Sequence, residues 1–240
     1  MHTLNRAGIF LLLFFSLAVT RQPVCLGEKE SSILQGEFPT KVEILKYFLT
    51  VFRPSKKSAQ RPLVFLLHGR GQKGGDYLKI WKEEADRRGY LLLAPTWQYG
   101  YRGSSQDLEG FYELLGEIIQ KYPVNREKVY LAGISSGALV GRWLLLERPS
   151  VWKAVVLTAS PPYDGWANPS RLEGLPPVLL VHGARDNQFH FGEAVRRVKI
   201  LREQGVRADL LGYLNAGHEQ RPEWSKDIFD WMEKNSGGQS

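Results

Sequence analysis

The stretch VYLAGISSGALVGRW, residues 129–143, determines the interpretation of the fold. Its first four residues form a short apolar run rich in β-formers, and the residues from Ala138 onward have a helical pattern. Between them lies the motif G-x-S-x-G, with Ser135 at its centre. A strand that turns sharply into a helix through two glycines lifts the hydroxyl of the central serine above the sheet. The stretch therefore predicts a strand–turn–helix unit with a candidate nucleophile, Ser135, at the turn.

Strand-like and helix-like runs alternate on both sides of this unit. Such alternation is typical of an α/β fold with a mostly parallel sheet and helices on both faces, because central strands buried on both sides are almost continuously apolar. We expect the run 42–52 to be an antiparallel edge strand or a bent pair. The expected strands are 42–52, 63–67, 90–94, 129–132, 154–157, 178–181 and 210–214, and the expected helices are 77–88, 106–122, 136–147, 193–204 and 223–234.

Length and composition fit one globular domain. The chain has 240 residues, of which 43% are hydrophobic and 24% charged, so a disordered, collagen-like or coiled-coil architecture is excluded. Cys25 is the only cysteine, which excludes an intramolecular disulfide and a thiolate metal cluster. Because the sequence also lacks histidine pairs with metal-site spacing and a P-loop ending, we expect no metal and no cofactor.

The net charge of +7 does not indicate a nucleic-acid partner. The densest basic stretch, Arg196, Arg197, Lys199 and Arg202, lies in a helical pattern whose apolar positions are 195, 198 and 201. We therefore interpret these charges as the solvated side of a helix rather than as a binding face.

The N-terminus has the pattern of a secretory signal peptide. Arg6 precedes an apolar run of 11 residues, 9–19, which is shorter than the ~20 residues of a membrane-spanning helix. We expect cleavage before Glu28, or alternatively after Thr20, so that residues 1–27 are the signal and 28–240 the mature domain. The protein is then exported, and secreted or periplasmic, without a stable membrane span. An uncleaved anchor and a lipidated Cys25 are the alternatives.

Two residues are candidates to complete a site around Ser135. A serine hydroxyl is too weakly acidic to attack a carbonyl without a base, and that base must itself be oriented. Asp186 follows the expected strand 178–181, and His218 follows the expected strand 210–214. Since loops at the carboxyl ends of parallel strands meet at one edge of a sheet, we expect the three side chains to converge there.

Other acids and histidines fit these roles less well. Asp164, after the expected strand 154–157, is the alternative acid, and Glu219 adjoins His218 but is expected to point elsewhere. His68 and His182 each precede a glycine at a strand end, and we interpret both as structural.

Two backbone amides are candidate donors to an oxyanion. The amide of Ser136 lies at the start of the expected helix, where backbone N–H groups lack partners within the helix. The loop His68-Gly-Arg-Gly71 follows the strand 63–67, and its glycines allow it to pass close to the serine. We expect the amide of Arg70 to be the second donor.

On these loops, residues 62–231 resemble the α/β-hydrolase superfamily, and their spacing is similar to that of small esterases. The related groups are phospholipase/carboxylesterases, polyhydroxybutyrate-depolymerase-like esterases and feruloyl esterases. The motifs are LLHGRG (66–71), AP (94–95), GISSG (133–137), VHGARD (181–186) and GH (217–218). The order Ser, Asp, His is the one found in that superfamily. The resemblance implies an α/β-hydrolase fold without an evident lid domain, and hydrolysis through a Ser135–His218–Asp186 triad.

The resemblance identifies the reaction better than the substrate. We expect a secreted serine esterase acting on a small-molecule or polymer-derived carboxylic ester. Trp97, Tyr99, Tyr163 and Trp166 follow two of the expected strands and are candidate substrate-binding residues, either at the rim of the site or in the core. The alternatives are a serine peptidase of the prolyl-oligopeptidase type and a non-catalytic hydrolase-like binding protein.

Overall fold

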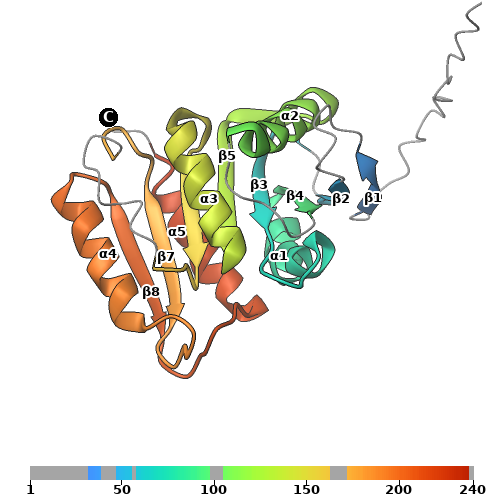
Figure 1. Ribbon diagram of the computed structural model, residues 1–240. Coiled ribbons are helices and arrows are strands. Elements are labelled where there is room, and N and C mark those ends of the chain that lie inside the picture. The colour runs from blue at the N-terminus through green and yellow to red at the C-terminus, as the bar shows by residue number, and fades with distance from the viewer. Residues whose placement is uncertain (1–31, 39–46, 56–57, 98–104, 163–171, 238–240) are drawn as a thin grey trace, which may run out of the picture.

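The central feature of the computed structural model is one eight-stranded sheet with the strand order β1-β2-β4-β3-β5-β6-β7-β8 (Figure 1). The structure describes residues 32–38, 47–55, 58–97, 105–162 and 172–237. β2 pairs antiparallel with both β1 and β4, and the other neighbouring strands pair in parallel, so the predicted mostly parallel sheet is confirmed. The strands are β1 (Ser32–Phe38), β2 (Tyr47–Arg53), β3 (Arg61–Leu67), β4 (Leu91–Thr96), β5 (Val124–Ile134), β6 (Ala154–Thr158), β7 (Val178–Gly183) and β8 (Ala208–Tyr213).

Helices cover both faces of the sheet. They are α1 (Gly74–Arg88), α2 (Ser105–Lys121), α3 (Ser136–Glu147), α4 (Phe191–Glu203) and α5 (Ser225–Lys234), with short 3₁₀ turns at η1 (Pro149–Val151) and η3 (Pro222–Trp224). Alternate residues of a strand point to opposite faces, and β3 shows this directly. Leu63 and Phe65 belong to the core under α2, α3 and α4, whereas Val64 and Leu66 belong to the core under α1 and α5.

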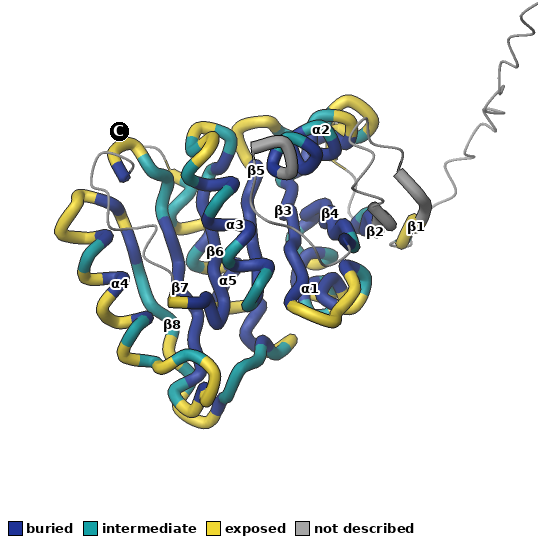
Figure 2. Tube along the Cα trace, in the orientation of Figure 1, coloured by how far each residue is buried: buried dark blue, intermediate teal, exposed yellow. Residues whose placement is uncertain are grey.

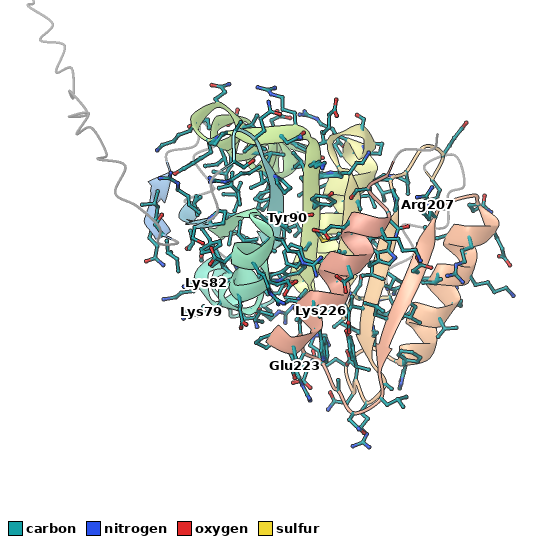
Figure 3. The ribbon with its side chains drawn as sticks, turned by 180° about the vertical axis from the view of Figure 1, so that it is seen from behind. Lys79, Lys82, Tyr90, Arg207, Glu223 and Lys226 are labelled. Atoms are coloured by element: carbon teal, nitrogen blue, oxygen red, sulfur yellow. The ribbon has the colours of Figure 1, made fainter. Side chains whose placement is uncertain are left out.

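The burial pattern explains the apolar strand sequences. Figure 2 shows buried residues along the central strands and exposed residues on the outer sides of the helices. In Figure 3, which views the molecule from behind, α5 with Lys226 and α1 with Lys79 and Lys82 face the viewer. Because both faces are covered, strands such as β3 and β7 require apolar side chains at nearly every position.

The N-terminal edge of the sheet differs from the prediction. The antiparallel strand expected within 42–52 is present as β2, but the edge strand is β1, which the sequence did not predict. β1 mixes polar and apolar residues around a glycine, and its Ile33 and Leu34 are more than 40% exposed. Pairing with β2 along its whole length defines it as a strand, and local sequence carries little of that signal.

The prediction that the four basic residues of 196–202 lie on the solvated side of a helix was wrong for one of them. Arg197 on α4 is 3% exposed and donates a hydrogen bond from Nη1 to the carbonyl oxygen of Ser160 at 3.1 Å. Val195, interpreted as apolar and inward-facing, is 48% exposed. The inner face of α4 is therefore rotated from the expected one, although Val198 and Leu201 are buried as predicted.

Among the helices of the described ranges, none is both long enough and apolar enough to cross a bilayer. The signal peptide 1–27 and the domain boundary at Glu28 lie outside the described residues and stay predictions.

Candidate active site

Ser135 lies at the sharp turn between β5 and α3. Its φ of 54° and ψ of −117° put a non-glycine residue in a strained backbone conformation, one of two described non-glycine residues with positive φ. Its amide donates to the carbonyl oxygen of Thr158 on β6 at 2.9 Å, which extends the β5–β6 ladder by one residue. Such strain costs of the order of 1–3 kcal/mol and is found where it serves function. The predicted strand–turn–helix unit is confirmed.

The two glycines of G-x-S-x-G are required by close backbone approaches. A Cβ on Gly133 would lie 2.4 Å from the carbonyl oxygen of Gly137. A Cβ on Gly137 would lie 2.1 Å from the carbonyl oxygen of Leu67 and 2.6 Å from that of His68. All three distances are well inside van der Waals contact, so a side chain at Gly133 would push α3 away from β5, and one at Gly137 would push it away from β3. The motif therefore works by letting the helix start directly against the neighbouring strand.

Three side chains from different strand ends form a hydrogen-bonded row. The hydroxyl of Ser135 donates to Nε2 of His218 at 2.8 Å, and Nδ1 of His218 donates to Oδ2 of Asp186 at 2.8 Å. Ser135 and His218 are 83 residues apart in sequence, and Asp186 and His218 are 32 apart. The His218 side chain is 13% exposed and that of Asp186 is fully buried. The predicted convergence is confirmed.

Asp186 is held as a carboxylate by several donors. Oδ1 accepts the backbone amides of Gln188 at 2.8 Å and Phe189 at 3.0 Å, while Oδ2 accepts the proton of His218. Burial raises the pKa of Asp186, but the hydrogen bonds from the Phe189 amide, the His218 ring and the Gln188 amide outweigh it and hold the pKa below its usual value. A charged carboxylate then fixes the tautomer of His218, with its proton on Nδ1 and its lone pair on Nε2 facing Ser135.

The loop after β3 passes beside the serine, as the glycines of its motif predicted. A Cβ on Gly69 would lie 3.6 Å from the Cβ of Ser135. A tight turn shapes the loop, since the Gly69 amide donates to Oε1 of Gln72 at 2.9 Å and the Gln72 amide donates to the Gly69 carbonyl at 3.2 Å. Arg70 is the exposed residue that follows Gly69 in this turn. The roles expected for the amides of Arg70 and Ser136 stay predictions.

His68 and Trp97 make contacts that support the loop after β3. Nδ1 of His68 donates to the Gly69 carbonyl at 2.8 Å, and Nε2 accepts the Trp97 amide at 3.4 Å. The two rings stack with centroids 3.8 Å apart, and the indole also packs edge-on against Phe111. His68 is structural, as expected. Trp97 is only 7% exposed and belongs to the core, so of the two positions considered for this candidate substrate-binding residue, the rim and the core, it takes the core.

The other substrate-binding and acid candidates lie outside the described residues. They are Tyr99, Tyr163, Trp166 and Asp164. Glu219 points away from the triad as expected, because its Oε1 accepts from Arg221 at 2.6 Å. No group of three or more His, Cys, Asp or Glu side chains in the described part of the chain is arranged to hold a metal ion.

Sequence reasoning missed two residues that support the triad. The Phe189 ring packs edge-on against the His218 imidazole, with centroids 5.1 Å apart. Oε1 of Gln220 accepts from the hydroxyls of Tyr77 and Thr158, both at 2.8 Å, which ties the His218 loop to α1 and β6. Closeness in sequence to Asp186 and His218 was the only signal available for either residue.

Comparisons with known proteins agree with this arrangement. A model of the prolyl oligopeptidase family matches residues 161–239, which contain Asp186 and His218. A poly(3-hydroxybutyrate) depolymerase of Ralstonia pickettii is 26% identical over 140 residues, covering 48% of this chain. This chain spans only 28% of the length of that depolymerase.

Two solved structures share the fold at low sequence identity. The S-formylglutathione hydrolase of Staphylococcus aureus is 14% identical with a TM-score of 0.70, and the match covers 87% of this chain and 100% of the hydrolase. The acylaminoacyl peptidase of Pyrococcus horikoshii is 16% identical with a TM-score of 0.67, and the match covers 89% of this chain and 43% of the peptidase. Together with the strand order and the turn at Ser135, these likenesses establish that the chain has the α/β-hydrolase fold.

Proposed function

We propose that this protein is a serine hydrolase that cleaves carboxylic ester bonds through an acyl-enzyme intermediate. The hydrogen-bonded row from Ser135 through His218 to Asp186 carries the proposal. It joins a strained serine, an imidazole in the required orientation and a buried carboxylate, which are the three groups that nucleophilic acyl transfer needs. The esterase-like motifs and the similarity to a depolymerase support ester bonds as the target.

In the first half-reaction, Oγ of Ser135 attacks the ester carbonyl carbon while Nε2 of His218 removes the hydroxyl proton. Asp186 stabilises the imidazolium that forms, and His218 then gives the proton to the departing alcohol. We assign the backbone amides of Ser136 and Arg70 as donors to the oxyanion. In the second half-reaction, water attacks the carbonyl carbon of the acyl-enzyme while Nε2 of His218 removes a proton from the water. His218 then gives that proton to Oγ of Ser135, and the carboxylic acid leaves.

Export of the protein and the nature of its substrate are part of the same proposal. Arg6 and the apolar run 9–19 support export by a signal peptide that is cleaved before Glu28. A small or polymer-derived ester is the proposed substrate. Tyr99, Tyr163 and Trp166 remain the proposed aromatic contacts to it, since each follows a strand that ends at this edge of the sheet.

Fluorophosphonate labelling and hydrolysis of p-nitrophenyl esters test the proposal. Wild type is expected to be labelled at one site and to hydrolyse short-chain esters. Ser135→Ala is expected to lose both, and Ser150→Ala, a change of an exposed serine, is expected to keep both. If Ser135→Ala keeps full turnover, Ser135 is not the nucleophile. If wild type is neither labelled nor active, a non-catalytic binding role replaces the proposal.

A serine peptidase is the second candidate function. The match of residues 161–239 to the prolyl oligopeptidase family favours it, and the same triad serves amide bonds. Dipeptidyl and acylaminoacyl amides with chromogenic leaving groups separate the two functions. Higher kcat/KM on these amides than on p-nitrophenyl esters of equal acyl size would reverse our preference for esters.

A further inference from the structure

A second histidine, His182, lies behind the acid of the candidate triad. It is the penultimate residue of β7 and is 3% exposed. Its Nε2 lies 2.8 Å from the carbonyl oxygen of Phe189 and 3.3 Å from Oδ2 of Asp186. The same oxygen accepts the proton of His218, so two imidazoles meet one carboxylate oxygen.

The contacts of His182 define its tautomer. A carbonyl oxygen only accepts, so Nε2 of His182 must carry the proton and donate it to Phe189. The positive end of that N–H group then also faces Oδ2 of Asp186. Burial lowers the pKa of His182, and nearby Arg197 and His218 act in the same direction, whereas the Phe189 carbonyl and Asp186 oppose them. A neutral imidazole places a donor beside the carboxylate without adding a charge that would compete with protonated His218.

Phe189 connects this bond to the reacting side of the site. Its amide donates to Oδ1 of Asp186, its carbonyl accepts from His182, and its ring packs against the His218 imidazole. The hydrogen bond from His182 therefore reaches the residue that contacts both the carboxylate at Nδ1 of His218 and the side of its ring. His182 itself is anchored by the sheet, because β7 pairs with both β6 and β8.

We propose that His182 is a positioning residue that holds the turn from Asp186 to Phe189 and, through it, the orientation of His218. This inference rests on the proposed function, in which His218 is the base. The role needs a donor at the Nε2 position, so it makes different demands on glutamine, asparagine and leucine. Glutamine can place its amide nitrogen near Nε2, asparagine is too short to do so, and leucine has no donor.

The test compares His182→Gln, His182→Asn and His182→Leu with wild type, and uses His190→Gln, an exposed histidine in the same loop, as the control. Steady-state hydrolysis of a p-nitrophenyl ester is measured after folding is checked by circular dichroism. We expect kcat to fall about 10²-fold in the leucine and asparagine variants with KM within about twofold, because a misplacement near 1 Å has effects of that size. In His182→Gln kcat is expected to recover to within about fivefold of wild type, and His190→Gln is expected to match wild type.

A second readout does not depend on turnover. The proton between Nδ1 of His218 and Asp186 is expected as a far-downfield line in the proton NMR spectrum, and to shift or broaden in the leucine and asparagine variants only. If His182→Leu does not fold, the asparagine and glutamine variants decide. Full kcat and an unmoved proton line in His182→Asn, or an equal loss of kcat in His182→Gln, would overturn the positioning role. Failure of the proposed function is recognised separately, as a wild-type protein that fluorophosphonate does not label.

Discussion

Gly137→Ala offers the most direct test of how the nucleophile turn is built. Gly137 is the second residue of α3, the helix that Ser135 precedes, and it lies against the end of β3. Its added Cβ would be 2.1 Å from the Leu67 carbonyl oxygen, whereas real Cβ contacts essentially never fall below 3.0 Å. The helix and the strand must therefore separate by about 0.9 Å to admit one methyl group.

The size of the effect follows from the stiffness of both partners. Overpacking a core by a methyl group costs about 1–3 kcal/mol, and more where neighbours cannot move. Both neighbours here are backbone atoms of paired elements, so we expect a loss of at least about 3 kcal/mol in the free energy of unfolding. For a domain of this size that is a fall in Tm of about 6–12 °C. The same displacement moves Ser135 relative to Gly69, which predicts a loss of kcat of about 10²-fold.

Gly116→Ala is the matched control. Gly116 lies within α2, and a Cβ there meets nothing within 4 Å. Alanine in a helix is favoured over glycine by about 0.5–1 kcal/mol, so this variant is expected to gain about 1–4 °C in Tm and to keep its activity. Thermal unfolding by circular dichroism and urea titration compare the two substitutions in the same fold.

Two results would refute this reasoning. One is a Gly137→Ala protein as stable and as active as wild type, because the β3–α3 contact would then not be as close as described. The other is a Gly116→Ala protein destabilised as much as Gly137→Ala, because the effect would then come from glycine replacement in general.

Three further predictions concern the triad and its supports. Asp186→Asn is expected to lower kcat by about 10⁴-fold with the fold intact, because an amide favours the wrong imidazole tautomer; steady-state ester hydrolysis measures this. The lowered pKa of Asp186 means that its ionised form stabilises the fold above an unfolded-state pKa of about 3.9, and that this contribution is lost as pH falls through the lower folded value. Urea titrations of wild type and Asp186→Asn should therefore differ most above about pH 4 and converge as pH falls through the lower folded pKa; a constant difference would contradict the assignment. Gln220→Leu leaves the buried hydroxyls of Tyr77 and Thr158 without their acceptor, so we expect a loss of about 1–3 kcal/mol for each in urea unfolding, and no change in stability would show that the network contributes nothing.

The elements of the fold that could be predicted are those whose burial requires a run of apolar residues. β3, β4, β6 and β7 are apolar because helices cover both faces, and each was expected within a few residues of its observed range. β1 escaped prediction because only its partner β2 makes it a strand. β5 begins five residues before its expected start, since positions 125–128, of which 126–128 are exposed, carry polar and charged side chains that are uncommon in strands.

The site divides in the same way. Ser135, Asp186 and His218 were predictable because each chemistry-bearing residue follows an apolar strand in a fixed order. The supporting contacts were not, because they depend on how each loop turns in space. Sequence alone does not indicate that the loop after β7 brings the Phe189 carbonyl to 2.8 Å from the His182 ring, or that the Trp97 indole stacks on His68.

The amide of Ser135 takes part in the ladder between β5 and β6 through its bond to Thr158, whereas His218 lies on the segment between β8 and η3. The nucleophile is thus held by the sheet, and the base by a connecting segment. On heating, we expect the imidazole of His218 to move away from Ser135 while the sheet is still intact. We therefore expect activity to be lost at a lower temperature than the sheet unfolds, and parallel measurements of ester hydrolysis and circular dichroism on heating check this.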